Sequence, residues 1–433
     1  MIRRIVLPGV VAMAAGAQLA AQAPPAQPSS RPTAYAITNA TIVPVVGARI
    51  TNGTVVIRNG RIEAAGAGVA TPAGITVIDG RGLFVYPGLI DSGDRMGLTE
   101  IGSVPGGQDT QELGQFNPQN DVITAVNPSS VHIPVTRANG VTSAITSAQG
   151  GMIQGTAALI DLAGWTPDEM ATKGRVAMVM TYPRVGGGGG RGGFRGGQGQ
   201  PDGAEAQNRQ VQELYGYLRN AKAYNERANP AIKNLAFEAL GPALKGEVPV
   251  IFDVQTEAQI RGVLALADTF KLRVVLRGAT EAWMLADTLA ARKIPVVVGP
   301  LTSVPSGDAP YDAVYANPGV LAKAGVQIAF QTDDGGEGDA RNLPYNAALA
   351  TAYGLDPEEA LRAITINPAR IWGVADRLGS IEAGKVANLF VTNGDPLDVR
   401  TQAKHVFIRG QLMDWDDRHT QEYQKWRARP KPQ

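Results

Sequence analysis

The feature that most constrains the fold of this chain is an alternation of short apolar runs with longer helical patterns between residues 88 and 373. Strands that alternate with helices in this way imply parallel βαβ units. About 290 residues of such repeats favour a closed (β/α)8 barrel in the α/β class, with an open α/β sheet as the alternative. The apolar runs cover residues 176–180, 248–252, 272–276, 294–298 and 326–330, and the helical patterns between them cover 208–227, 257–269, 281–292 and 318–324.

A second structural unit is split between the two flanks of the barrel. Its strand-like segments are residues 36–42, 54–58, 61–65 and 75–79 before the barrel and 388–392 and 406–409 after it. Asn59-Gly60, between two of them, predicts a type I′ hairpin. Because neither set has enough strands to bury both of its faces, we expect the two sets to combine. The expected domains are a composite β-sandwich of residues 35–84 and 380–414, an inserted barrel of residues 85–379, and a charged surface tail of residues 415–433.

The N-terminal part of the chain is typical of an export segment followed by a linker. Two arginines precede an apolar core at residues 5–17, and small residues around Ala21 suit a signal peptidase. We therefore expect a signal peptide of residues 1–21, a Pro/Ser/Gln-rich linker of residues 22–34, and a protein exported to a periplasm or out of the cell. The alternative is an uncleaved membrane anchor, which the short, Pro- and Gly-interrupted run disfavours.

The composition excludes several kinds of site. A formal net charge of +1 gives no long-range field for nucleic acid or an anionic membrane. The absence of cysteine excludes disulfides, thiolate metal sites and cysteine nucleophiles. Zinc centres usually take two or three imidazoles from one pocket, which a chain with three histidines can scarcely supply. We expect His132 in a loop ahead of a strand, His405 in the composite β-unit and His419 in the tail, and none of them as a catalytic base.

A glycine-rich tract at residues 185–203 interrupts the barrel sequence. The backbone entropy of so many glycines disfavours a packed element, so we expect a barrel loop there. One alternative is a flap over the barrel mouth. Another is an RGG-like contact with RNA, which the few arginines and the near-neutral net charge disfavour.

Four sequence phrases bracket the barrel and occur in the order in which a known family has them. They are FVYPGLIDS at residues 84–92, TINPAR at 365–370, LGSIEAGK at 378–385 and NGDPL at 393–397. On these phrases the chain resembles the amidohydrolase superfamily, most of all its imidazolonepropionase-like and prolidase-like branch. The resemblance implies a (β/α)8 barrel in which one or two divalent metals activate a water molecule for attack on an amide carbon.

The resemblance also implies a position for most of the metal ligands. The His-x-His pair that the family has at the end of its first barrel strand falls on Gly93 and Arg95. The strand-five histidine falls on Asp253, and the strand-six histidine falls on Arg277. The strand-eight aspartate, which is also the general base of the family, is retained as Asp333. The bridging lysine or glutamate has no position that we can assign.

The side chains at these positions predict a site without a cofactor. Arginine is permanently charged and has no lone pair for a metal, so Arg95 and Arg277 would repel a divalent cation and fill its volume. Charge-assisted pairs such as Arg277–Asp333 would then satisfy the arginines and aspartates. The alternative is a divalent metal: magnesium, calcium or manganese on an all-oxygen set, or the zinc that the family implies. Its ligands would be Asp91, Asp94, Asp253 and Asp333, with Asp334 beside them.

Three functions remain open from the sequence. The first is a non-catalytic accessory subunit that pairs with an active paralogue, with a homo-oligomer as the other assembly. The second is a metal-dependent hydrolase of carbon–nitrogen bonds. The third is a module that binds a small amide or peptide-like ligand. A glycine-rich turn that resembles a substrate-side loop of the family makes Gly151, Met152 and Gln154 candidate pocket residues, whereas Trp283 and Trp372 are expected to pack in the core.

Overall fold

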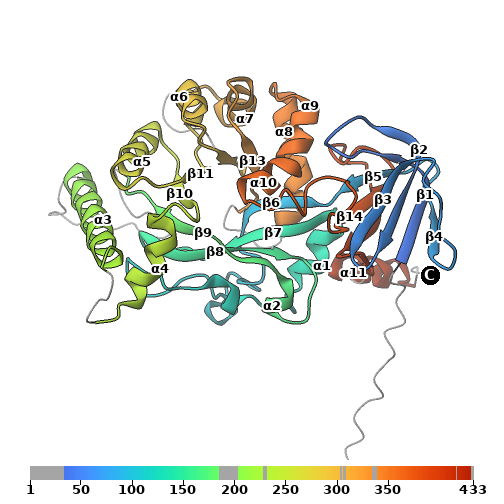
Figure 1. Cartoon of the computed structure of the whole chain (residues 1–433), viewed down its shortest axis with the longest axis horizontal. Coiled ribbons are helices and arrows are strands. Elements are labelled where there is room, and N and C mark those ends of the chain that lie inside the picture. Colours follow the sequence, from blue (N-terminus) through green and yellow to red (C-terminus); the bar gives the residue numbers. More distant parts are fainter. Residues whose placement is uncertain are drawn as a thin grey trace, which may run out of the picture.

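Two eight-stranded sheets organise the molecule, which is known from a computed structural model (Figure 1). The structure describes residues 34–184, 203–227, 232–302, 305, 309–333, 339–415 and 417–430. The expected signal peptide, all but the last residue of the linker, nearly all of the glycine-rich tract, and Asp334 lie outside the described residues. Within the described part of the chain, no helix is both long enough and apolar enough to cross a bilayer.

The first sheet forms the predicted barrel. Its strands follow one another in chain order: β6 (Leu89–Asp94), β7 (Val141–Ser147), β8 (Ile153–Asp161), β9 (Ala171–Thr181), β10 (Val250–Val254), β11 (Val274–Gly278), β12 (Val296–Val298) and β13 (Ile328–Phe330). The backbone carbonyl of Gly93 accepts hydrogen bonds from the N–H groups of Thr332 at 3.3 Å and Asp333 at 3.2 Å, which joins β6 to the end of β13. The barrel predicted from the βα alternation is therefore confirmed.

One strand departs from the all-parallel barrel that the sequence predicts. Strand β8 runs antiparallel to both β7 and β9, whereas the other neighbouring strands are parallel. A parallel crossover needs a dozen or more residues, and the connection between Ser147 and Ile153 is far shorter. The chain therefore turns back as a hairpin there, and a short helix, α2 (Pro167–Met170), leads into β9.

Helices surround the barrel and follow its later strands (Figure 1). Helix α5 illustrates why these segments are helical: a capping box between Thr256 and Gln259 begins it. Its buried residues recur at the three- and four-residue spacing of a helix face. The expected helix 281–292 is divided into η3 (Ala282–Leu285) and α6. The outer helices are α3 (Gly203–Asn225), α4 (Leu235–Leu244), α5 (Glu257–Phe270), α6 (Ala286–Ala291), α7 (Ala313–Lys323), α8 (Leu343–Ala352) and α9 (Pro357–Ala363).

The barrel interior is filled by aliphatic side chains and one tryptophan. Strand residues such as Ile90, Ile251 and Val275 form one buried cluster with residues of and after α10 (Ile366–Ile371). Trp372 is 1% exposed, and its indole N–H donates to the Ser92 hydroxyl at 3.1 Å. The interior is thus a packed core rather than a channel, and Trp372 has the packing role that its sequence context predicts.

The second sheet is the composite β-unit. Its strands are β1 (Ala34–Ile42), β2 (Ile50–Arg58), β3 (Arg61–Ala67), β4 (Thr76–Asp79) and β5 (Phe84–Pro87) from the N-terminal flank, and β14 (Leu389–Thr392), β15 (Ala403–Ile408) and β16 (Gln411–Leu412) from the C-terminal flank. Strand β14 pairs with β5, which joins the two flanks. Strands β14 and β5 both lie between β1 and β15 in the sheet, yet the ring centroids of Tyr35 in β1 and Phe407 in β15 are 5.1 Å apart. The sheet therefore folds over one shared core, as the expected sandwich requires.

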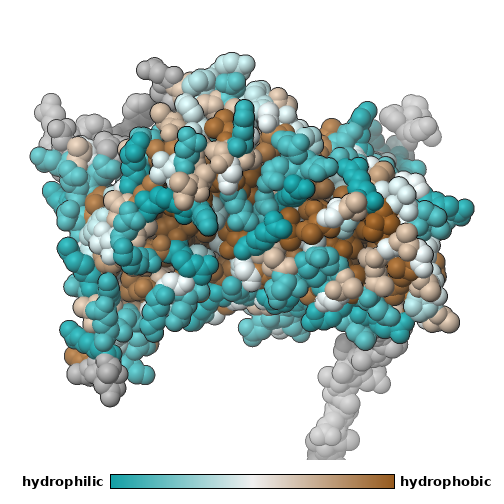
Figure 2. Space-filling model, turned by 45° about the horizontal axis from the view of Figure 1, so that its top comes forward, coloured by the Kyte–Doolittle hydropathy of each residue, from teal (hydrophilic) through white to brown (hydrophobic). Residues whose placement is uncertain are grey.

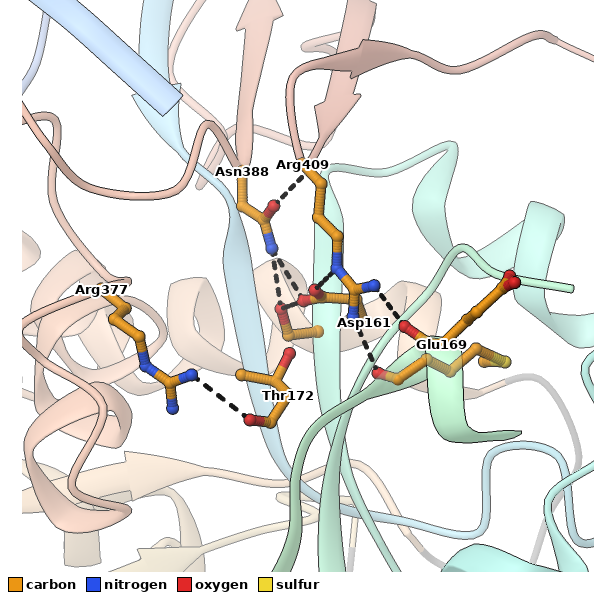
Figure 3. Close-up of polar contacts among 8 residues, drawn as sticks. Asp161, Glu169, Thr172, Arg377, Asn388 and Arg409 are labelled. Atoms are coloured by element: carbon orange, nitrogen blue, oxygen red, sulfur yellow. Dashed lines mark hydrogen bonds and ion pairs between the residues drawn. The ribbon is translucent and has the colours of Figure 1, made fainter. Parts of the chain in front are cut away.

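A buried polar network joins the β-unit to the barrel (Figure 3). Asp161, at the end of β8, accepts hydrogen bonds from the Ser143 hydroxyl at 2.9 Å and the Asn388 amide at 2.8 Å. The Arg409 guanidinium adds an ion pair to Asp161 at 2.7 Å and also bonds the Glu169 carbonyl. Because the Asp161 side chain is only 3% exposed, its charge depends on these partners.

Several helices lie outside the four predicted helical patterns, and two of them replace a different expectation. Helix α1 (His132–Arg137) replaces the loop that we expected around His132, and α11 (Arg418–Arg427) forms within the expected surface tail. Both are short, and no residue of α11 is buried, so neither presents the apolar face by which the longer helices are recognised. On the face drawn in Figure 2, hydrophilic residues cover most of the surface, and hydrophobic residues are most visible near the middle and toward the β-unit.

Candidate functional site

The candidate site lies where the barrel strands end. Asp94 is the last residue of β6, and Asp333 follows β13 by three residues. Asp253 of β10 and Arg277 of β11 are partners in register on neighbouring strands. The structure therefore brings Arg95, Asp253, Arg277 and Asp333 to the carboxyl ends of the strands, the end at which barrel proteins of this kind carry their sites.

Arg277 makes a largely buried ion pair with Asp253. Its Nε lies 2.6 Å from Oδ1 of Asp253, and its Nη2 lies 3.0 Å from Oδ2, which makes the pair bidentate. Its Nη1 donates to the Ser147 hydroxyl at 2.8 Å. Burial by itself lowers the pKa of the Arg277 guanidinium, but the charge and hydrogen bonds of Asp253 outweigh it and the pKa is raised. Arg277 therefore stays charged in an interior position.

A second arginine pairs with the retained aspartate. Arg95 places its Nε 3.1 Å and its Nη2 2.9 Å from Oδ1 of Asp333, and the Arg95 side chain is 11% exposed. The sequence analysis gave Arg277–Asp333 as an example of an ion pair, but Arg277 pairs with Asp253 and Asp333 pairs with Arg95. Strand register puts Asp253 directly beside Arg277, while Asp333 lies across the barrel seam next to β6.

Gly93 leaves no room for a side chain in this packing. A Cβ atom there would lie 2.3 Å from Oε1 of Gln331 and 3.2 Å from Cδ of Arg277. Gln331 is itself held by a hydrogen bond from its amide to the Gly299 carbonyl at 2.7 Å. The space that the family's first histidine would need at position 93 is thus occupied by Gln331 and Arg277.

Two carboxyl groups, the buried one of Asp91 and the partly exposed one of Asp94, lie beside the ion pairs. Oδ2 of Asp91 and Oδ2 of Asp94 both face the single hydroxyl of Thr332, the latter at 3.3 Å. Burial raises the pKa of Asp91 well above its usual range, and the nearby Asp94 adds to the effect. Burial, followed by the charge of Asp333, raises the pKa of Asp94 to about 7. One hydroxyl proton cannot serve two carboxylates, and burial and mutual repulsion raise both pKa values, so this arrangement favours the protonated form more than a free carboxylate would.

Of the three candidate loop residues, only Gln154 reaches the cluster. Its amide nitrogen donates to the Thr181 hydroxyl at 2.7 Å and to Oδ2 of Asp253 at 3.3 Å. Its side-chain oxygen Oε1 is buried without a hydrogen-bond partner. Gly151 and Met152 instead pack against the segment after β6, where the Met152 N–H donates to the Gln115 carbonyl at 2.8 Å.

The three histidines lie outside the cluster. His132 begins α1, with Nε2 3.0 Å from the Glu100 carbonyl. His405 lies in β15, where burial lowers its pKa. His419 lies in α11 beside Arg341. No imidazole therefore contributes to the residues at the barrel mouth that the structure describes.

Several site residues were missed by the sequence analysis. Ser147, Thr181 and Thr332 are the hydroxyl partners of the cluster, and Gln331 fills the space beside Gly93. A positional signal exists for three of them, because Ser147 and Thr181 are the last residues of their strands and Thr332 precedes Asp333. Nothing in the sequence distinguishes Gln331 from an ordinary strand-end residue.

Comparison with known proteins agrees with this architecture. Residues 312–413 match the sequence profile of the amidohydrolase family. An imidazolonepropionase of Shouchella clausii is 43% identical over 76 residues, which are 17% of this chain and 17% of that protein. The chain thus aligns with less than a fifth of the length of the curated relatives that it matches first.

Solved structures extend the likeness to the whole described fold. The structure of an amidohydrolase from Thermotoga maritima superposes with a TM-score of 0.77 at 25% identity, over 88% of this chain and 99% of that one. A zinc-bound adenosine deaminase from Xanthomonas campestris shares the fold, with a TM-score of 0.53 at 19% identity over 91% of this chain and 97% of that one.

The barrel and the β-unit built from both flanks define a (β/α)8-barrel protein with a composite β-domain. Within that class, the chain belongs to the amidohydrolase superfamily, as its sequence phrases predicted.

Members of this superfamily are generally metal-dependent, and the described residues of this chain do not fit a divalent cation. Both oxygens of Asp253 are engaged by Arg277, and Oδ1 of Asp333 is engaged by Arg95. Among the residues with described positions, no three His, Cys, Asp or Glu side chains are grouped so as to hold a metal ion. Two guanidinium groups would also repel a cation placed among the carboxylates.

Proposed function

We propose that this chain is an exported, non-hydrolytic member of the amidohydrolase superfamily that serves as an accessory subunit of an active paralogue. In the proposed pseudo-site, defined as Arg95, Asp253, Arg277 and Asp333, arginine–carboxylate pairs stand where a hydrolase holds its metal. The observation that carries the proposal is the bidentate Arg277–Asp253 pair, in which Arg277 is 8% exposed. The guanidinium occupies both oxygens of Asp253, Gln154 adds a third hydrogen bond, and the fixed positive charge beside this carboxylate opposes a cation.

The chemistry of a hydrolase needs a water that is activated at neutral pH. The superfamily obtains it from a bound metal, which lowers the pKa of the water. Here the pseudo-site offers guanidinium groups, which cannot accept a proton, and Asp333, which is paired with Arg95 at 2.9 Å. Asp91 is buried, and the single Thr332 hydroxyl lies within hydrogen-bond distance of both Asp91 and the partly exposed Asp94. This arrangement supports a stable, inert barrel mouth.

The partner is proposed to be a homologue that keeps the His-x-His pair and supplies the activity. Such a subunit shares the fold, so the two barrels can form a pseudo-symmetric interface of the kind that homo-oligomers use. The proposal predicts a complex of defined stoichiometry when the two proteins are co-expressed with their export segments. If this chain forms a homo-oligomer and does not bind the co-expressed paralogue, the accessory role is contradicted.

The experiment that tests the proposal is a hydrolysis assay on the full chain after dialysis against zinc or manganese. The substrates are N-acyl amino acids, dipeptides and cyclic amides, and the matched control is the Asp333→Asn variant. We expect no turnover above the level of the control. Turnover by the wild type that disappears in Asp333→Asn would establish a metal-dependent hydrolase and overturn the proposal.

A second function, binding of a small amide or peptide-like ligand at the mouth, is favoured by one observation. The side-chain oxygen Oε1 of Gln154 is buried without a hydrogen-bond partner, and burying an unpaired acceptor is costly. An N–H group of a ligand would satisfy it. Isothermal titration with N-acetylated dipeptide amides tests this function, and wild-type binding that equals that of Gln154→Leu would exclude it.

A further inference from the structure

A cavity of about 460 Å³ lies at the amino-terminal ends of β10, β11 and β12, the opposite end of the strands from the candidate site. Its lining includes the residues that follow the C-terminal ends of α5 and α6 and lead into the next strands. Its floor is aliphatic, with buried side chains that include Leu272, Ile294 and Ile371. Its rim carries Lys271, Arg273, Arg292 and Lys293, and we call it the basic cavity.

The positive charge of the basic cavity is only partly neutralised. Asp268 is the one carboxylate in its lining, and it pairs with Arg292, whose Nη1 lies 3.3 Å from Oδ2. Arg273 bonds backbone carbonyl groups, that of Gly246 at 3.1 Å. Neither Lys271 nor Lys293 has a hydrogen-bond or ion-pair partner among the residues whose positions are described. A ligand here would therefore meet unpaired ammonium groups.

The two lysines occupy backbone positions that disfavour a lysine. Lys271 has φ 58° and Lys293 has φ 53°, both in the left-handed region, where a Cβ atom is strained. The helices on either side use glycine at the corresponding place: Gly246 after α4 and Gly325 after α7 have φ 73° and 89°. Glycine adopts this conformation without strain. The chain thus tolerates strained lysines at the two helix ends that border the cavity.

The helix dipole does not explain these two lysines. A cation near a helix C-terminus is favourable wherever it lies in the last turn. Lys245 caps α4 in the right-handed conformation, and Lys323 is the last residue of α7, so both complement a dipole without left-handed strain. The helix dipole accounts for a positive charge near these helix ends but not for the left-handed backbone conformation of Lys271 and Lys293.

The positive potential extends beyond the basic cavity. Lys173, at the start of β9, has a pKa lowered first by burial and then by the charges of Arg377 and Arg273. Arg377, which donates to the Thr172 carbonyl at 3.4 Å, is seen in Figure 3 beside the junction with the β-unit. Cations on this end of the barrel therefore reinforce one another, which favours an anion over a neutral ligand.

We propose that the basic cavity binds a small organic dianion, one with a phosphate or dicarboxylate head and an apolar body. The head would meet Lys271 and Lys293 at the rim, and the apolar body would lie on the aliphatic floor. The volume lies within the range of small-molecule sites, and the combination of an apolar floor with a few convergent charges is typical of them. The proposal does not depend on the pseudo-site.

The test uses the full chain with phenyl phosphate as the amphipathic dianion and inorganic phosphate as the dianion without an apolar body. Binding is measured by isothermal titration at low and high salt, with thermal shift as the second readout. The test variant is K271G/K293G, which removes both ammonium groups and relieves the left-handed strain, so it is expected to fold at least as stably as the wild type. The matched control, K245A/K323A, removes two helix-end lysines that do not line the basic cavity.

The expected result is saturable binding of phenyl phosphate, roughly tenfold or more tighter than that of inorganic phosphate. Binding should weaken with salt, fall by about tenfold in K271G/K293G and stay unchanged in K245A/K323A. No saturable binding of phenyl phosphate by the wild type would overturn the proposal. Equal loss in both variants would also overturn it, because it would show a diffuse charge effect. Binding to anionic vesicles without binding to phenyl phosphate would replace the small ligand by a membrane surface.

Discussion

Replacing Arg277 by methionine tests how strongly the barrel mouth depends on its guanidinium. Methionine keeps much of the aliphatic volume but removes the charge and the two bonds to Asp253, at 2.6 and 3.0 Å. The chain offers a matched control in Arg261, whose Nε lies 2.5 Å from Glu257 in an exposed i,i+4 pair. The two pairs are equally short and differ in burial, since the side chains of Arg277 and Arg261 are 9% and 62% exposed.

The difference in burial between the two arginines determines how much stability each substitution is expected to cost. Removing one partner of a buried ion pair costs roughly 3–5 kcal/mol, because the other charge is left without compensation. Since the Asp253 side chain is 29% exposed, water can compensate part of its charge, and we expect Arg277→Met to lower the free energy of unfolding by roughly 2–4 kcal/mol. Arg261→Met should lower it by no more than about 0.5 kcal/mol.

Urea denaturation followed by circular dichroism at pH 7 measures both values. Adding Asp253→Asn to Arg277→Met should recover stability, with a coupling energy of roughly 1–3 kcal/mol in the double-mutant cycle. The reasoning is refuted if Arg277→Met and Arg261→Met cost the same. It is also refuted if the second substitution recovers nothing, because the lost stability would then come from packing alone.

Three further predictions concern the surroundings of the pseudo-site and the domain junction. Because the pKa of Asp94 is raised to about 7 in the folded chain, its contribution to stability is present in acid and is lost as the pH rises from about 4 to about 7. Asp94→Asn should therefore flatten the pH dependence of the free energy of unfolding, measured by urea titrations across that range. An unchanged pH dependence would show that Asp94 does not titrate there. Gly93→Ala should lower the melting temperature by an amount equivalent to about 1–3 kcal/mol, because the new Cβ atom meets Gln331 at 2.3 Å; a neutral effect would mean that the space is larger than the structure indicates. Arg409→Met should cost roughly 2–4 kcal/mol, because it leaves the carboxylate of Asp161, 3% exposed, without its ion-pair partner; limited proteolysis should then cleave between the β-unit and the barrel, and unchanged protection would contradict the junction's role.

Much of the fold was predictable because it depends on periodic patterns. Alternating apolar runs and helical patterns predicted the barrel, and the Asn59-Gly60 hairpin was confirmed by positive φ angles at both residues. The antiparallel β8 was not predicted, because its apolar residues read equally well as a parallel barrel strand. Its direction is decided by the length of the connection after Ser147, which excludes a crossover.

The candidate site was predictable in position but not in pairing. The family phrases placed Arg95, Asp253, Arg277 and Asp333 at strand ends, and the structure brings them together. Their pairing depends on which strands are neighbours in register, and that information lies in the closed barrel rather than in any short segment. The contact of Asp91 and Asp94 with Thr332 was missed for the same reason, since Thr332 follows the last barrel strand whereas the two aspartates belong to the first.

The metal content of the purified chain tests the central claim most directly. The full chain is purified without chelators, dialysed against zinc and manganese, passed through a desalting column and measured by elemental analysis. Arginine–carboxylate pairs in the pseudo-site predict less than about 0.1 equivalent of either metal per chain. Retention of about one or two equivalents, lost on Asp333→Asn, would show that the barrel mouth is a metal centre and would contradict the account.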